Sequence, residues 1–359
     1  MLVKFSSLRH PALSRQLYPT LQSRVASLRF MSAEEGPSKS SMAPKPPKPL
    51  ILQKLGMYGE LSKFRLSSLV VVTSGAGFLA TGLPIDWTVL AATCVGTGFC
   101  AASANTWNQI REQKFDANMN RTKARPLPSG RMKTGEAVAW GATAGLVGTG
   151  MLLASSNPVV AALGAGNIAL YAGPYTSLKR TSEVNTWIGS LVGAIPPLMG
   201  WAAATGGDLM SADPLFLAGI LFLWQFPHFF ALSWMHRDDY AKGGFQMVSV
   251  NDAAATRSGS LVLRYPAYLS TLPIAAYGMG LTSSMFALEG TAANMYLMYL
   301  AYKFNEKQSN ANARKVFMCS LWYLPLLLAS FVFYSKRWEV DDPLKEKSQV
   351  CNALACCSS

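Results

Sequence analysis

Long apolar segments separated by short polar loops make up most of the sequence after residue 64. A helix needs about 20 apolar residues to cross the hydrocarbon core of a bilayer, and these segments have that length. The strands of a membrane barrel would be shorter and would alternate apolar with polar residues. The pattern therefore predicts an all-α polytopic membrane protein with nine transmembrane helices. The expected spans are residues 65–84, 87–107, 136–155, 157–177, 186–205, 213–235, 262–282, 285–303 and 316–335.

The loops between these spans fall into two sets by charge. Lys and Arg are concentrated at residues 111–133, 179–180, 237–257 and 303–315, whereas the loops GLPID, SSNP, TGGDLMSADP and LTSSM contain neither. Loops rich in Lys and Arg are retained on the inner side of a membrane. The basic loops and the amino terminus are therefore expected on one side, which in a mitochondrial inner-membrane protein is the matrix.

Composition supports the membrane assignment. The chain has 359 residues, of which 50% are hydrophobic and only 14% are charged, although its formal net charge is +13. Such a composition is typical of an integral membrane protein rather than of a soluble basic one. The lipid bilayer is thus an expected partner. Nucleic acid is not expected as a partner, because the positive charge after the amino-terminal segment lies in short loops between apolar spans.

The amino-terminal segment carries Arg and Ser but no acidic residue before Glu34. This composition is typical of a mitochondrial transit peptide, and we assign residues 1–31 to one. A disordered cytosolic tail is the alternative. Residues 32–54 form a Pro-, Ser- and Lys-rich linker that is expected to be disordered because it cannot bury a core.

A nine-helix domain is expected over residues 55–337, followed by a disordered tail at 338–359. Cys351, Cys356 and Cys357 lie in this tail. They are either part of an unstructured segment or a metal or redox site.

Oxygen-bearing side chains recur every four residues after the second span. Asn108, Glu112 and Asp116 have this spacing, which places them on one face of a helix, rising about 1.5 Å per residue. Carboxylates hold Mg²⁺, and the cations that follow could neutralise phosphate oxygens. Alternatively, the two acids lie in solvent beyond the helix end. The candidate diphosphate-binding cations here are Arg121, Lys123 and Arg125.

A second acidic group, HRDDYAKGG, follows the sixth span and contains Asp239, Tyr240 and Lys242. It stands in the same topological place as the first, at the basic-side end of an even-numbered helix. Two acidic helix ends facing each other could hold Mg²⁺ ions that bridge one diphosphate. A solvated loop with an Arg237–Asp238 ion pair is the alternative.

Polar residues in two further segments are candidates for substrate contacts. In YTSLKRTSEVNTW, Lys179 and Arg180 are either anion contacts or topology-setting charge, and Asn185 stands at a helix start. WQFPHFFALSW contains Gln225 and His228, and a histidine at membrane depth is either functional or a satisfied structural residue. Prolines in this segment and in GAIPPLMGW (193–201) predict a kinked and a broken helix.

Three segments, taken in their order along the chain, resemble the UbiA superfamily of intramembrane prenyltransferases. Within that superfamily they resemble the branch that farnesylates protohaem IX. The resemblance covers residues 55–335 and implies a UbiA-type bundle. Two departures are present: Glu112 stands where the superfamily usually has Asp, and Gly243 replaces the second Asp of a D-x-x-x-D motif. The matching segments are NQIREQKFDANMNRTKARPLPSG, YTSLKRTSEVNTWIGSLVGAIPPLMGW and WQFPHFFALSWMHRDDYAKGGFQMVSV.

The resemblance implies farnesyl diphosphate and protohaem IX as substrates, haem O as product, and a role in supplying haem for cytochrome c oxidase. Haem A synthase or oxidase assembly proteins are implied as possible partners. The implied Mg²⁺ ligands are Asn108, Glu112, Asp116 and Asp239, with Tyr240 also catalytic. The implied diphosphate contacts are Arg121, Lys123, Arg125, Lys179, Arg180 and Lys242, and the implied haem contacts are Asn185, Gln225 and His228.

Two other functions stay open on the sequence alone. A sister enzyme that prenylates an aromatic or quinone acceptor would share the diphosphate site but differ in its acceptor pocket. A non-enzymatic carrier or assembly scaffold would need neither acidic group.

Overall fold

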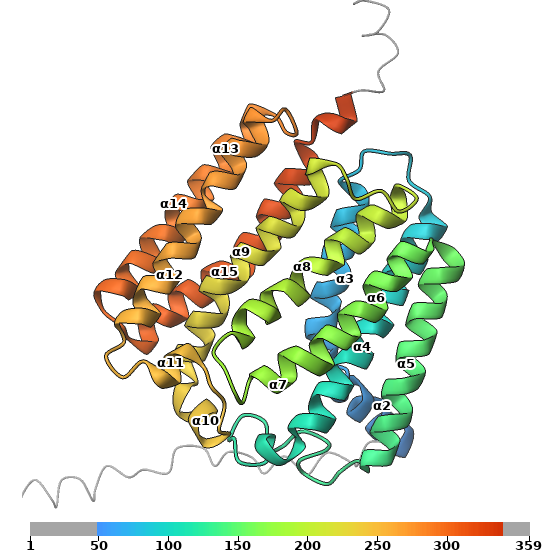
Figure 1. Cartoon of the computed structure of the whole chain (residues 1–359), viewed down its shortest axis with the longest axis vertical. Helices are drawn as coiled ribbons and strands as arrows, with labels where there is room; N and C mark the ends of the chain where they lie inside the picture. Colours follow the sequence, from blue (N-terminus) through green and yellow to red (C-terminus); the bar gives the residue numbers. More distant parts are fainter. Residues whose placement is uncertain (1–48, 340–359) are drawn as a thin grey trace, which may run out of the picture. The chain divides into compact units, whose positions relative to one another are not determined.

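The computed structural model describes residues 49–339 (Figure 1). The predicted transit peptide (1–31), the linker up to residue 48 and the tail from residue 340 lie outside the described residues. Two compact units are distinguished, Met1–Leu52 and Gln53–Ser359, and the architecture below is that of the second. Helix α2 (Leu50–Leu61) begins within the segment that the sequence assigned to a linker.

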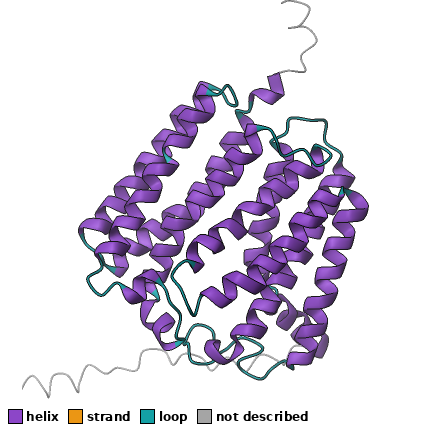
Figure 2. Cartoon of the chain, viewed as in Figure 1, coloured by secondary structure: helices purple, strands orange, loops and turns teal. Residues whose placement is uncertain are grey.

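Helices make up nearly all of the described chain, and the predicted all-α class is confirmed (Figure 2). Within residues 49–339, extended pairing is limited to one isolated bridge, between Thr282 and Ser335. The remaining helices are α3 (Phe64–Leu79), α4 (Trp87–Asp116), α5 (Thr134–Ser155), α6 (Pro158–Leu170), the π-helical turn η1 (Tyr171–Tyr175), α7 (Thr176–Leu178), α8 (Asn185–Ala204), α9 (Ala212–Met235), α10 (Arg237–Lys242), α11 (Val248–Asn251), α12 (Thr256–Leu269), α13 (Thr271–Gly278), α14 (Ser284–Glu306), α15 (Asn310–Phe333) and the 3₁₀ turn η2 (Lys336–Glu339).

Each of the nine expected spans coincides with one helix or with consecutive helices. Among the described residues, five helices are long and apolar enough to cross a membrane: α4, α5, α8, α9 and α15. Helix α3 is apolar but shorter. Two further expected spans are divided, one between α6, η1 and α7 and another between α12 and α13, whereas the span at 285–303 is the single helix α14, which is not among the five. The membrane class is supported, and the count of nine spans is not confirmed.

Polar side chains fix where several helices begin. Asp86 accepts hydrogen bonds from the N–H groups of Thr88 and Val89 at 2.9 and 3.1 Å, which caps α4. Asn157 caps α6 through the N–H of Val160 at 3.1 Å. These side chains satisfy N–H groups that have no partner within their own helix.

Helices α3 and α8 cross closely at two glycines. A Cβ atom at Gly77 would lie 2.0 Å from the carbonyl oxygen of Pro197, and one at Gly200 would lie 1.8 Å from that of Ser74. Neither position has room for a larger residue, so the two backbones approach as small residues allow in membrane helix pairs. Helix α8 runs uninterrupted through Pro196 and Pro197, so the predicted break in this segment is wrong. Its packed neighbours hold it as one helix.

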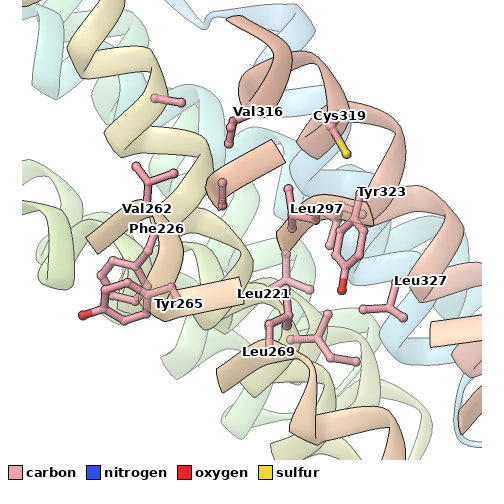
Figure 3. Packing of buried hydrophobic residues seen from close by; sticks show 14 of the residues in the cluster. Leu221, Phe226, Val262, Tyr265, Leu269, Leu297, Val316, Cys319, Tyr323 and Leu327 are labelled. Atoms are coloured by element: carbon pink, nitrogen blue, oxygen red, sulfur yellow. The ribbon is translucent and has the colours of Figure 1, made fainter. Parts of the chain in front are cut away.

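The largest apolar core joins α9, α12, α14 and α15 (Figure 3). Phe226 of α9 stacks on Tyr265 of α12, with ring centroids 3.8 Å apart. In the same core, the Tyr323 hydroxyl donates to Asn294 Oδ1 at 2.8 Å, which satisfies both buried polar groups. This core holds α9 in place, and α9 leads directly into the second acidic group.

Candidate active site

Helix α4 continues past the predicted end of its apolar span and ends at Asp116. Asn108, Glu112 and Asp116, here called the α4 stripe, are therefore helical, as their spacing predicted. Their exposed fractions are 0%, 4% and 2%. The alternative of two solvated acids beyond the helix end is wrong. Arg111 does not pair with them but donates to the carbonyl of Ala172 at 2.7 Å.

A cationic side chain contacts each member of the stripe. Lys179 Nζ lies 2.9 Å from Glu112 Oε1, and Arg125 Nη1 lies 2.6 Å from Asp116 Oδ2. Lys63 Nζ donates to Asn108 Oδ1 at 3.1 Å. These three residues, here called the site cations, come from three segments far apart in the sequence. The stripe is thus a buried row of oxygen atoms faced by three basic side chains.

Lys63 was not identified from the sequence. It lies between α2 and α3 with φ 47° and ψ 53°, a left-handed conformation rare for a residue with a side chain. Its ammonium also donates to the Tyr171 hydroxyl at 3.3 Å. Burial, followed by the nearby charges of Arg125 and Lys179, lowers the pKa of Lys63 to about 7. The only sequence signal was a lysine just before the first span, which resembles ordinary topology-setting charge.

The turn between α6 and α7 supplies the wall opposite α4. Asn108 Nδ2 donates to Thr176 Oγ1 at 3.0 Å, and that hydroxyl donates to the carbonyl of Tyr171 at 2.7 Å. Tyr171 and Tyr175 stack with centroids 4.9 Å apart, and the Lys179 ammonium lies 4.7 Å from the Tyr175 ring centroid. The chain forms a π-helical turn here, a feature that often marks functional sites.

The Lys179 side chain is 12% exposed and lies against Glu112 of the stripe rather than in solvent. Burial alone disfavours an ammonium, but the Glu112 carboxylate beside it raises the pKa of Lys179 well above its usual range. Lys179 therefore stays charged. Its neighbour Arg180 is exposed and lies 3.8 Å over the ring of Phe115, away from the stripe's carboxylates.

The second acidic group meets the loop after α4. Asp239 Oδ1 and Oδ2 accept hydrogen bonds from the backbone N–H groups of Asn120 and Arg121, at 2.8 and 3.0 Å. Although partial burial opposes ionisation, these N–H groups lower the pKa of Asp239. The two helix ends therefore lie close together, as predicted. The contact is a pair of hydrogen bonds from the backbone after α4 to Asp239, whose carboxylate does not face the stripe.

The donor chemistry of the stripe fits a hard divalent cation. One amide oxygen and two carboxylates lie in a row, and oxygen ligands of this kind are those that Mg²⁺ takes. Across residues 49–339, no three His, Cys, Asp or Glu side chains gather closely enough to form a metal site. Glu112 and Asp116 with Asp239 are thus not a preformed three-carboxylate cluster.

The other predicted diphosphate contacts lie at the exposed rim. Arg121 donates to the Tyr240 hydroxyl at 3.3 Å and lies 5.5 Å over its ring. Lys123 donates to Asn120 Oδ1 at 3.1 Å, and Lys242 is exposed. Asp238 is 91% exposed and pairs with Arg237 at 3.7 Å, as the solvated-loop alternative predicted for this pair.

Packing at Gly243 accounts for the incomplete D-x-x-x-D motif. A Cβ atom there would lie 2.8 Å from Met119 Sδ and 2.9 Å from a ring carbon of Phe245. Met119, Phe245 and Met247 form a small buried cluster beneath the loop after α4. A second aspartate at position 243 would displace this cluster.

Two of the predicted acceptor contacts have structural partners. The Asn185 amide, 1% exposed, donates to the carbonyls of Ser182 and Gln246, both at 2.7 Å. The Gln225 amide donates to the carbonyl of Ser190 at 2.9 Å. Both amides join backbone segments of α8, α9 and the loop after α10.

His228 lies between α9 and α15, stacked on Trp224 and Phe317 with centroids 4.9 and 4.7 Å away. Its Nδ1 is 2.8 Å from Ser320 Oγ, and that hydroxyl donates its hydrogen to the carbonyl of Phe317 at 2.6 Å. Nδ1 must then be the donor to Ser320. This tautomer leaves the lone pair on Nε2, which has no hydrogen-bond partner among the described residues.

Comparison with known proteins identifies the family. The model of the UbiA prenyltransferase family matches residues 68–335. A mitochondrial protoheme IX farnesyltransferase of Arabidopsis thaliana is 42% identical over 300 residues, covering 83% of this chain and 69% of that protein. The Homo sapiens protein of the same name is 44% identical over 273 residues, covering 76% of this chain and 61% of that protein. The chain thus spans between 61% and 69% of the length of these relatives.

Solved structures share the fold. A structure of digeranylgeranylglyceryl phosphate synthase matches with a TM-score of 0.67 and 17% identity, over 80% of this chain and 100% of that one. A UbiA homologue from Archaeoglobus fulgidus bound to DMAPP and Mg²⁺ matches with a TM-score of 0.59 and 13% identity, over 79% and 99% of the two chains.

The protein is thus an all-helical bundle of the membrane class that carries a buried row of oxygen atoms with basic side chains against it. The chain belongs to the UbiA prenyltransferase family.

Proposed function

We propose that this protein transfers the farnesyl group of farnesyl diphosphate to a vinyl group of protohaem IX, giving haem O. The observation that carries the proposal is the buried α4 stripe with its three site cations, Lys63, Arg125 and Lys179. Support also comes from relatives of 42% and 44% identity that are named protoheme IX farnesyltransferase. A carrier or scaffold would have no use for buried charges of this kind, which are costly in a membrane protein.

The site cations have the chemistry needed to bind the diphosphate and to stabilise the negative charge that develops as it leaves. Lys179 and Arg125 are charged donors already fixed in place, so little reorganisation is needed during the reaction. Arg121, Lys123, Arg180 and Lys242 supply further positive charge at the rim, where they would attract the substrate. Tyr240 positions Arg121 through its hydroxyl.

Asn108, Glu112 and Asp116 are the residues that would hold Mg²⁺, which when bound would neutralise charge on the leaving diphosphate. Asp239, whose two oxygens bind the N–H groups of Asn120 and Arg121, would hold the loop after α4 beside them. Loss of diphosphate leaves an allylic farnesyl cation, and exclusion of water by the protein protects it. The vinyl π bond of protohaem forms the new carbon–carbon bond to this cation. Water then adds to the resulting carbocation and loses a proton, giving the hydroxyethylfarnesyl group.

The acceptor end of the site is assigned to α9 and the start of α8. His228 faces Phe317 and Ser320 of α15, on the side of α9 opposite Phe226 and Phe230, and would act on the acceptor by holding α9 in place. Asn185 and Gln225 hold α8 and α9 in register and act on the acceptor by positioning this wall.

We place the protein in the mitochondrial inner membrane, with the diphosphate site toward the matrix and residues 1–31 as its targeting segment. The relatives are mitochondrial by name. The site cations and rim cations all belong to the basic-side loops or helix ends, which the positive-inside rule orients inward. Haem A synthase or oxidase assembly proteins are the partners that would receive the product.

The test is farnesyl transfer by purified protein, with haems extracted and analysed by mass spectrometry. Asp116→Asn keeps the side-chain shape but removes the charge that faces Arg125. Loss of one transition-state stabiliser costs about 2.7–4 kcal/mol, so turnover should fall by roughly 10²–10³. Asp238→Asn is the matched control, because Asp238 is 91% exposed, and its turnover should be normal.

Near-normal turnover by Asp116→Asn would refute the role of the stripe. Transfer of farnesyl to an aromatic or quinone acceptor, without a farnesylated haem, would identify a sister prenyltransferase instead. Absence of diphosphate release with every acceptor would contradict an enzymatic function.

A further inference from the structure

A cavity of about 480 Å³ lies beside the start of α8, apart from the α4 stripe. It is an open hollow rather than an enclosed chamber, so it would take one edge of a ligand and leave the rest outside. It is lined by Ser182, Glu183, Val184, Trp187 and Arg257. None of these residues has a role in the diphosphate site described above.

The apolar wall of this cavity is a fixed aromatic ring. Trp187 donates its indole N–H to the Tyr265 hydroxyl at 2.7 Å. The indole also packs against Phe226 and Phe230, with centroids 5.7 and 5.9 Å away. A ring held from several sides offers a flat surface on which a planar macrocycle can stack.

The polar rim of the cavity is a guanidinium. Arg257 forms an ion pair through Nη1 with Glu183 Oε2, and its side chain remains 54% exposed. The other oxygen of Glu183 accepts from Asn251 Nδ2 at 3.0 Å, so this carboxylate is already satisfied. Arg257 has five N–H donors, and the ion pair engages one nitrogen. The remaining donors are available to an anionic ligand.

A second arginine lies on the same face of α12. Arg264 follows Arg257 by seven residues, which is nearly two full turns and about 10.5 Å along the helix. It is exposed although it falls within a segment expected to span the membrane. It stands only two residues inside that span, so its long side chain can reach the interface and an anion there. The face of α12 toward the cavity therefore carries two cations in line.

The segment from Lys179 to Asn185 joins this cavity to the diphosphate site. Lys179, at one end, pairs with Glu112, while Ser182 and Glu183 line the cavity. Three residues of chain span at most about 11 Å, so the two sites are adjacent. Gln246 braces the segment, because its N–H donates to the Lys179 carbonyl at 2.7 Å and its carbonyl accepts from Asn185.

We propose that this cavity binds the carboxylate-bearing edge of a planar tetrapyrrole acceptor, with the macrocycle stacked on Trp187 and its two carboxylates held by Arg257 and Arg264. This rests on the proposed function and specifies where its acceptor lies. Because Arg257 pairs with Glu183, the carboxylate-bearing edge would lie beside the segment from Lys179 to Asn185. Donor and acceptor are thus bound on either side of one short stretch of chain.

The experiment uses full-length protein in nanodiscs of phosphatidylcholine alone, so that anionic lipid headgroups cannot occupy the arginines. Haem and haem dimethyl ester, whose carboxylates are blocked, are titrated against wild type, Arg257→Ala, Arg257→Lys and Arg264→Ala. Arg314→Ala is the control, because Arg314 is an exposed arginine at the start of α15 outside the cavity. The KM values for haem and for farnesyl diphosphate are measured in parallel.

Arg257→Ala and Arg264→Ala should each weaken haem binding and raise the haem KM about tenfold, while the farnesyl diphosphate KM stays constant. Wild type should bind the ester about tenfold more weakly than haem, and the alanine variants should not discriminate between them. Arg257→Lys should recover part of the discrimination. An unchanged haem KM in both alanine variants that still make haem O would overturn this proposal and leave the proposed function standing. If wild type binds haem and its ester equally, the proposal also fails, whatever the enzyme's activity.

Discussion

The Glu112–Lys179 ion pair allows the role of a site cation to be separated from its contribution to stability. Substitution Lys179→Met keeps most of the side-chain volume and removes the ammonium, so the buried Glu112 carboxylate loses its direct ion-pair partner. Removing one partner of a buried pair typically costs about 3–5 kcal/mol. For a domain of this size, each kcal/mol lowers Tm by about 2 °C, so Tm should fall by roughly 6–10 °C.

The double variant Lys179→Met/Glu112→Gln provides the decisive comparison. With no carboxylate left to compensate, most of the lost stability should return, because replacing a buried pair by neutral groups is often nearly neutral. Farnesyl transfer should not return, since it needs both charges, and turnover should remain reduced by roughly 10²–10³. Tm is measured by thermal unfolding in detergent, and turnover by haem O formation. A single variant as stable as wild type would refute the buried-pair reasoning, and a double variant with normal turnover would refute the catalytic one.

Three further predictions address other parts of the molecule. Because burial lowers the pKa of Lys63 to about 7, the unfolded chain binds one more proton than the folded chain between pH 7 and 10.5. The free energy of unfolding should therefore rise with pH across this window. Lys63→Met should flatten this rise, which is measured by thermal unfolding at pH 7 and 9.5. An equal change of Tm with pH in both proteins would contradict the burial of the Lys63 ammonium. Gly200→Ala places a Cβ 1.8 Å from a backbone oxygen and should lose about 1–3 kcal/mol of stability. The control Gly166→Ala, with no heavy atom within 4 Å of the new Cβ, should lose none. Equal unfolding temperatures of the two variants would exclude the close crossing of α3 and α8. His228→Ala should leave the absorption spectrum of bound haem unchanged, because His228 faces α15 rather than Trp187; an altered spectrum would instead identify this histidine as an iron ligand.

Local periodicity was sufficient to predict that the three residues of the stripe lie on one face of a helix. The spacing of Asn108, Glu112 and Asp116 by four residues requires only that the helix continue, and α4 does continue to Asp116. The partners of these residues were not predictable in the same way. Lys63 lies 45 residues from Asn108 along the chain, and Lys179 lies 67 residues from Glu112. Such pairs form only when separate helices are packed together.

Neighbouring basic residues that the sequence did not distinguish also lie in different environments in the structure. Arg125 contacts Asp116 directly, whereas Lys123, two residues earlier, is exposed and binds Asn120. Lys179 is buried against Glu112, and its neighbour Arg180 lies on Phe115. Adjacent residues point in different directions from a turn, and charge alone does not reveal which of them faces the core.

The sequence by itself determined the helical membrane class, the side on which charge accumulates and the residue types available for chemistry, because hydropathy and periodicity are local properties. The tertiary structure decided which charges meet. Contacts between distant segments bury the stripe and pair it with Lys63, Arg125 and Lys179. They also bring Asp239 to the backbone of the loop after α4. Buried charges need partners in a low-dielectric interior, and only the packed helices supply them.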